Sequence, residues 1–102
     1  MGEFVEVIKK ADLEEGKGMV VEVGDKKVAL FNVGGEFHAI DNLCPHKQGP
    51  LGEGMLDGDN VACPWHGWVF SVKNGVSPVN PATKVVKYNV KIEEDNVLIE
   101  KQ

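Results

Sequence analysis

Two short motifs constrain the fold of this chain most strongly, because they contain its only two cysteines. Cys44-Pro45-His46 is a C-x-H motif and Cys63-Pro64-Trp65-His66 is a C-x-x-H motif, with sixteen residues between His46 and Cys63. Two buried, inert thiols are the ordinary interpretation of such a pair. That interpretation leaves the two histidines unexplained. The sequence therefore predicts a fold in which two loops converge and offer four metal ligands.

Short apolar runs separated by turn residues predict β-strands and no helix of three turns. The turns at 24–26 and 34–35 contain glycine, which tolerates the positive φ that tight hairpins require. In the run Glu36 to Ile40, alternation places Phe37 and Ala39 on one face. The predicted strands cover residues 4–8, 19–23, 27–33, 36–40, 84–92 and 96–100, and residues 10–18 are predicted to form a helical turn or loop.

The segment from Asp41 to Pro81 has a different character, because it contains every proline and every tryptophan of the chain. Long regular elements are not expected there. Asp57-Gly58 and Asn74-Gly75 each predict a tight hairpin. We therefore expect an all-β fold, a small antiparallel β sandwich or barrel, with an inserted loop-rich subdomain from about residue 41 to 81.

Length and charge narrow the class of protein. A chain of 102 residues predicts a single domain over residues 1–102. The net charge of -5 disfavours nonspecific binding to nucleic acid or to an anionic membrane. No apolar run approaches the roughly 18 residues of a membrane span, and the N-terminus lacks the apolar region of a signal peptide. The expected location is the cytoplasm.

The mixed ligand types in each motif indicate which metal site to expect. Two cysteines and two histidines suit zinc or an iron–sulfur cluster. A zinc finger pairs cysteine with cysteine and histidine with histidine, whereas each motif here pairs one of each. In a two-iron cluster, the two cysteines can bind one iron and the two histidines the other. Two thiolates leave the oxidised site neutral, whereas four make it a dianion, so the neutral site accepts an electron more easily.

The spacing C-x-H, sixteen residues, C-x-x-H, with Gly67 after the second histidine, resembles the Rieske [2Fe–2S] signature. The resemblance runs without a detectable gap from Gly34 to Val76, and the flanking strands fit the small β domain of that family. It implies a Rieske-type fold and one [2Fe–2S] cluster. By this resemblance Cys44 and Cys63 hold the buried iron, and His46 and His66 hold the outer iron near the surface.

Other positions follow from the same resemblance. Gly49 and Gly67 would let backbone N–H groups approach the sulfides. Either Pro78 or Pro81 would belong to the loop that shields the cluster; Pro81 is preferred, and a simple connection between strands is the alternative. His38, the remaining histidine, is expected to be an ordinary strand residue.

Departures from the respiratory members of the family narrow the type. Their additional disulfide-forming cysteines correspond here to Gln48 or Gly49 and to Trp65, so no disulfide is expected. Where those proteins have a serine and a tyrosine that donate hydrogen bonds to sulfur, this chain has Trp68 and Phe70. The sequence is therefore similar to the soluble, low-potential Rieske-type ferredoxins.

The resemblance implies a one-electron carrier that is not a catalyst on its own. Its expected partners are a flavin-dependent reductase and a terminal oxygenase. The segment "CPHKQGPLGEG" is also similar to the small subunit of NAD(P)H-dependent nitrite reductase, whose partner is the large subunit. A zinc-stabilised structural module is the third alternative.

Overall fold

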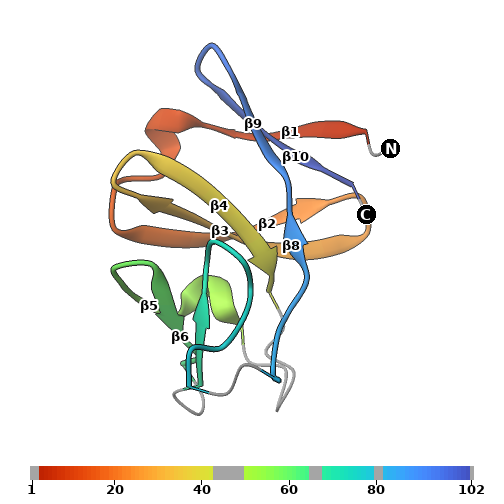
Figure 1. Ribbon diagram of the computed structural model, residues 1–102. Coiled ribbons are helices and arrows are strands. Elements are labelled where there is room, and N and C mark those ends of the chain that lie inside the picture. The colour runs from red at the N-terminus through yellow and green to blue at the C-terminus, as the bar shows by residue number, and fades with distance from the viewer. Residues whose placement is uncertain (1–2, 43–49, 65–67, 80–81, 102) are drawn as a thin grey trace.

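The computed structural model describes residues 3–42, 50–64, 68–79 and 82–101, and almost all of its regular structure is antiparallel β-strand (Figure 1). The strands are β1 (Phe4–Lys9), β2 (Lys17–Val23), β3 (Lys26–Val33), β4 (Glu36–Asp41), β5 (Met55–Asp57), β6 (Asn60–Ala62), β7 (Val69–Ser71), β8 (Lys87–Tyr88), β9 (Val90–Glu93) and β10 (Asn96–Glu100). Two short 3₁₀ helices accompany them, η1 (Lys10–Asp12) and η2 (Leu51–Glu53).

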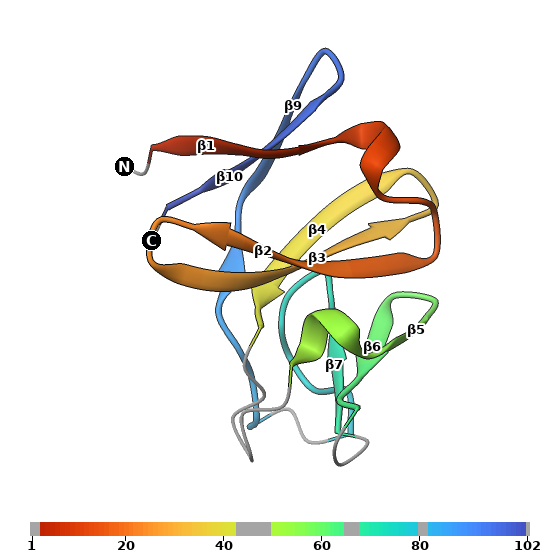
Figure 2. The ribbon, with the colours of Figure 1, turned by 180° about the vertical axis from the view of Figure 1, so that it is seen from behind.

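These strands form three small antiparallel sheets. The first has the order β1-β10-β9, the second β2-β3-β4-β8, and the third β5-β6-β7. Figures 1 and 2 show the first two sheets in the upper part of the molecule and the third sheet, with η2, below them. The third sheet and η2 belong to the predicted 41–81 insertion, which therefore forms a separate layer under the second sheet.

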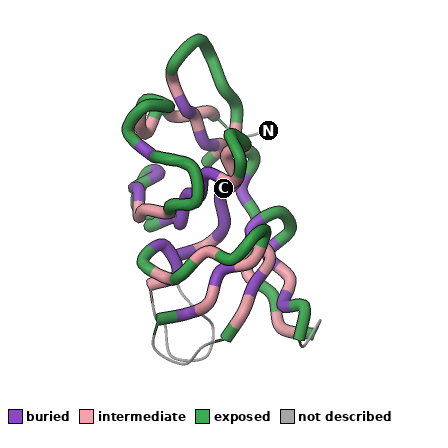
Figure 3. Tube along the Cα trace, turned by 90° about the vertical axis from the view of Figure 1, so that its left-hand side faces the viewer, coloured by how far each residue is buried: buried purple, intermediate pink, exposed green. Residues whose placement is uncertain are grey.

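Strand β3 joins the layers because both of its faces are buried. Val28 and Leu30 pack on one side, whereas Ala29 and Phe31 pack on the other, as the period-2 alternation of a strand requires. Figure 3 shows the resulting pattern, with buried positions along the strands and exposed positions at the hairpin turns. The upper core consists of Leu13, Val21, Val23, Val28, Leu30, Ala39, Tyr88, Val97 and Ile99. The lower core consists of Ala29, Phe31, Ile40, Leu51, Val61, Cys63, Phe70 and Val72.

Most of the predicted strands and turns are confirmed. The strand expected over 96–100 has those bounds as β10, and Phe37 and Ala39 both pack on the upper core. The Asp57-Gly58 turn joins β5 to β6, with Gly58 at a φ of 62°. The Asn74-Gly75 turn also forms, but Val76 then bridges Lys84 and does not extend a ladder with β7.

The strand expected over residues 84–92 is divided in the structure. Tyr88 of β8 pairs with Ala39 in the second sheet, whereas β9 pairs with β10 in the first sheet. Asn89 lies between them, and its backbone carbonyl accepts a hydrogen bond from the N–H of Glu100 (2.9 Å). The chain thus crosses from one sheet to the next within one apolar run.

No helix in the described ranges has the length and apolar character of a membrane span.

Candidate metal centre

Cys63 is the one predicted ligand that falls within the described residues; Cys44, His46 and His66 lie outside them. Cys63 directly follows β6, and only 2% of it is exposed. Its thiol is free and packs in the lower core. The strand β6 and the apolar side chains around it therefore fix this sulfur at the end of the third sheet.

The second predicted loop is closed directly at Cys63. The backbone N–H of Cys63 donates to the carbonyl oxygen of Trp68 (2.6 Å). The preceding pair is Ala62 with Val69, the last pair of the β6–β7 ladder. This hydrogen bond continues the pairing of β6 and β7 by one step, so Cys63 and Trp68, on either side of the segment that contains His66, are bonded directly.

The first predicted loop is closed in a similar way at the end of β4. The N–H of Leu51 donates to the carbonyl oxygen of Asn42 (2.6 Å). Residues 43–49, which include Cys44 and His46, lie between these two positions in the sequence. Both ligand motifs therefore occupy short connections whose described ends are joined by a backbone hydrogen bond.

The lower core contains a described residue from the flank of each connection. Leu51, which follows the first, and Cys63, which begins the second, belong to this one apolar cluster. The described chain ends on either side of both connections lie at the lower end of the molecule in Figure 1. The described residues that flank the two motifs thus lie in one part of the molecule, and the convergence of the four ligands stays a prediction.

A third connection reaches the same end of the molecule in Figure 1. The N–H of Ser77 donates to the carbonyl oxygen of Thr83 (2.9 Å), next to the bridge between Val76 and Lys84. Pro78 is exposed between these positions, whereas Pro81 lies outside the described residues. The choice between the two prolines as the shielding residue stays a prediction.

The two positions singled out for missing hydroxyl donors have different surroundings. Phe70 is fully buried in the lower core with Cys63, opposite Val61 in the β6–β7 ladder. Trp68 is 36% exposed, and it contacts Cys63 through its backbone carbonyl. Of these two positions, Phe70 is the one whose side chain belongs to the apolar cluster that contains Cys63.

His38 lies on β4, opposite Phe31. Its Nε2 atom is 3.2 Å from Oε1 of Glu36, which lies on the same strand. This placement agrees with the expectation of an ordinary strand residue.

The chemistry of the donor set fits an iron–sulfur cluster. Two thiolates and two imidazoles are the ligands of a mixed two-iron site. Cys63 is buried, which fits the predicted inner ligand of such a site. Within the described residues alone, no group of three metal-ligating side chains converges. The fit therefore rests on Cys63 and on the closure of both ligand-bearing connections.

Sequence reasoning missed Asn42. It is buried (3% exposed), and it closes the first connection with its backbone carbonyl. The one signal in the sequence is its position, directly after a predicted strand and two residues before Cys44. Asparagine is frequent at such turns because its side chain bonds to nearby backbone groups.

Comparison with known proteins agrees with this geometry. Residues 3–90 match the Rieske [2Fe-2S] domain. The chain is 38% identical to the ferredoxin component of the naphthalene 1,2-dioxygenase system of Pseudomonas putida, over 95% of this chain and 94% of that protein. It is 43% identical to apoptosis-inducing factor 3 of Mus musculus over 86% of this chain, but it spans only 15% of the length of that protein.

Solved structures agree as well. A chain in the complex of reduced oxygenase and oxidized ferredoxin in carbazole 1,9a-dioxygenase superimposes with a TM-score of 0.87 at 32% identity, covering 95% of this chain and 92% of that one. A putative NADH-dependent nitrite reductase small subunit from Mycobacterium tuberculosis superimposes with a TM-score of 0.93 at 21% identity, covering 100% and 97%, which shows a common fold. On these findings, the chain belongs to the Rieske [2Fe-2S] domain family.

Proposed function

We propose that this protein is a one-electron carrier that receives electrons from a flavin-dependent reductase and passes them to a terminal oxygenase. The observation that carries the proposal is the match to a dioxygenase ferredoxin component over nearly the full length of both chains. A ferredoxin bound to an oxygenase is among the structures that superimpose on this fold. Both comparisons favour a separate carrier that docks on its partners.

The proposed ligands are Cys44, His46, Cys63 and His66, with the two cysteines on one iron and the two histidines on the other. A [2Fe–2S] cluster of this kind supplies one-electron redox chemistry. The part of this chain is to hold the ligands and to keep water from Cys63, whose side chain packs among apolar residues. We further propose that residues 1–102 form one domain and that the protein acts in the cytoplasm.

The side chains around Cys63 favour a low potential. Phe70 has no hydroxyl group to donate to a ligand sulfur, and it lies in the same core as Cys63. A donor to sulfur stabilises the more negative, reduced state of a cluster, so its absence lowers the potential. A low potential suits a carrier that passes electrons onward to an oxygenase.

A ligand series tests the proposed site. Four single variants are made, with alanine in place of Cys44, His46, Cys63 or His66. Each variant should lose the visible absorbance and the iron, and its free energy of unfolding should fall, because metal binding is coupled to folding. The matched control is His38→Ala, since His38 lies on β4 with Glu36 as its partner. A variant of one of the four that keeps its full spectrum, or a His38 variant that loses it, would show that the ligand set is wrong.

The second candidate function is that of the nitrite reductase small subunit, which the segment "CPHKQGPLGEG" favours. The partners distinguish the two functions. The tagged holoprotein would be used to isolate its partner from its own source, and the partner would be identified by its absorbance and by stopped-flow oxidation of the reduced carrier. An oxygenase that oxidises the carrier within its turnover time supports the first function. A sirohaem reductase that binds the carrier in a one-to-one ratio would show that the second function is correct and the first is wrong.

A further inference from the structure

Asn42 uses both its backbone and its side chain to join the ends of the first connection. Its carbonyl oxygen accepts from the N–H of Leu51 (2.6 Å), and its side-chain Oδ1 accepts from the N–H of Gly52 (2.8 Å). Its own N–H donates to the carbonyl oxygen of Lys27 at the start of β3 (3.4 Å). One residue thus attaches the beginning of η2 to the end of β4 and to β3.

The burial of Asn42 makes the loss of its side-chain bond costly. Asn42 is buried, so the N–H of Gly52 would be left without its partner and away from water if the side chain were shortened. Leu51, the other bonded residue, packs fully buried in the lower core with Cys63. The Asn42 bonds therefore link the first ligand-bearing connection to the core that holds the inner ligand of the second.

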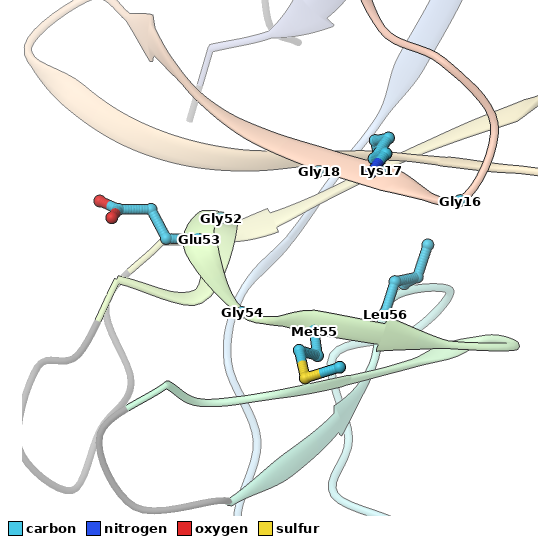
Figure 4. Close-up of a pocket in the computed structure, with 8 residues that line it drawn as sticks. All are labelled: Gly16, Lys17, Gly18, Gly52, Glu53, Gly54, Met55 and Leu56. Atoms are coloured by element: carbon cyan, nitrogen blue, oxygen red, sulfur yellow. The ribbon is translucent and has the colours of Figure 1, made fainter.

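Gly52 is fitted closely into the same arrangement. A Cβ atom at Gly52 would lie 2.7 Å from Cγ2 of Val20 and 3.0 Å from Oδ1 of Asn42. A hollow of about 300 Å³ lies between η2 and β5 on one side and the start of β2 on the other. Figure 4 shows glycines on both sides of it. The absence of a side chain at Gly52 lets η2 approach β2 closely enough for its N–H to reach Asn42.

We propose that Asn42 is a positioning residue for the connection that carries Cys44 and His46, and that Gly52 is its required counterpart. This inference rests on the proposed ligand set. Fixing both ends of a short segment reduces the number of backbone states that must be lost when its ligands take their places. It also sets the direction in which the segment leaves the sheet, and metal ligands tolerate only small errors in position.

The test compares Asn42→Ala with a matched control in the holoprotein. Asn32 is also a buried asparagine with two side-chain hydrogen bonds, from Nδ2 to the carbonyl oxygen of Leu13 (2.8 Å) and from the N–H of Gly35 to Oδ1 (2.9 Å). Neither of these bonds involves a residue next to a proposed ligand. Asn42→Ala removes the one side-chain bond to Gly52 and keeps the backbone bonds, whereas Asn32→Ala removes two side-chain bonds of a buried asparagine, which makes it a stringent control for stability.

Two properties separate positioning from general stability. The first is the rate of iron release to a chelator without denaturant, and the second is the EPR spectrum and visible circular dichroism of the bound cluster. Asn42→Ala should release iron about tenfold faster than wild type, which corresponds to about 1.4 kcal/mol of activation free energy. It should also change the EPR line shape. Asn32→Ala, which loses two side-chain bonds, should lower the urea midpoint at least as far as Asn42→Ala, with the spectra and the release rate of wild type.

Conservative variants complete the test. Asn42→Asp keeps an oxygen acceptor for the N–H of Gly52 and should restore most of the slow iron release, whereas Gly52→Ala should accelerate it with Asn42 in place. If Asn42→Ala does not fold, the same two measurements are made on Asn42→Ser. Equal release rates and unchanged spectra in the Asn42 and Asn32 variants would overturn the inference. Wild-type protein without iron would instead contradict the proposed function.

Discussion

Phe70→Tyr offers a direct test of how this chain sets its redox potential. Phe70 is fully buried and shares the lower core with Cys63, and we predict that a hydroxyl group added to its ring can donate to a sulfur of the proposed site. A hydrogen bond to a charged acceptor contributes about 1.5–3 kcal/mol, and only its difference between the two redox states changes the potential. Since a one-electron shift of about 59 mV corresponds to about 1.4 kcal/mol, we expect an increase of some tens of millivolts.

The assay is protein-film voltammetry of wild type and Phe70→Tyr at one pH, with the iron content of both confirmed. Phe37→Tyr is the matched control, because Phe37 packs on the upper core, which does not contain Cys63. The added hydroxyl group also costs some stability in a close-packed core, about 1–3 kcal/mol, which leaves the sign of the potential shift unaffected. An unchanged or lower potential with an intact cluster would refute the prediction that residue 70 faces a sulfur ligand.

Two further predictions concern the two cores and the alkaline limit of stability. Leu51→Ala and Leu30→Ala each empty a fully buried leucine site, in the lower and the upper core respectively, and each should cost about 2–5 kcal/mol in urea unfolding. Only Leu51→Ala should speed iron release from the native protein; equal acceleration in both variants would show that the lower core has no special part. Burial, with a smaller contribution from the charge of Asp41, raises the pKa of Tyr88 above its usual 10.0. The unfolded chain therefore ionises first as pH rises, and urea midpoints should fall above about pH 10 in wild type and fall less in Tyr88→Phe; parallel curves would contradict this.

Much of the fold follows from local patterns in the sequence. The run Asn96–Glu100 alternates and is bounded by polar turn residues, and it forms β10 with those bounds. The turn between β5 and β6 requires a positive φ, and Gly58 supplies it. The glycine after Asp57 is therefore what makes the hairpin predictable. Where a strand or turn depends on a few adjacent residues, the sequence is sufficient to predict it.

The remaining features depend on contacts between distant residues. Residues 84–92 are uniformly strand-like, and their division at Asn89 follows from pairing with β4 on one side and β10 on the other. The role of Asn42 leaves no periodic signal in the sequence, because it depends on a hydrogen bond to the backbone N–H of Gly52, ten residues further along the chain. The burial of Cys63 likewise depends on packing in the lower core with side chains of β3, β4 and β7. Each of these features is determined by tertiary contacts, which local propensity does not predict.

The sequence is sufficient to propose ligands for the candidate site because cysteine and histidine at this spacing have few other uses. Cys44, His46, Cys63 and His66 stay a predicted ligand set, and the structure adds the burial of Cys63 and the hydrogen bonds Leu51–Asn42 and Cys63–Trp68 between described residues. Those closures involve backbone groups of Asn42, Leu51 and Trp68, which no side-chain motif reveals.

The central claim is tested most directly by metal analysis of the purified protein together with EPR after reduction by dithionite. Protein made under iron-replete conditions should contain two irons and two sulfides per chain. Reduction should give a rhombic signal with an average g value below that of an all-cysteine cluster, because two imidazoles replace two thiolates on one iron. Stoichiometric zinc in place of iron, or iron with the signal of a four-cysteine cluster, would contradict the account.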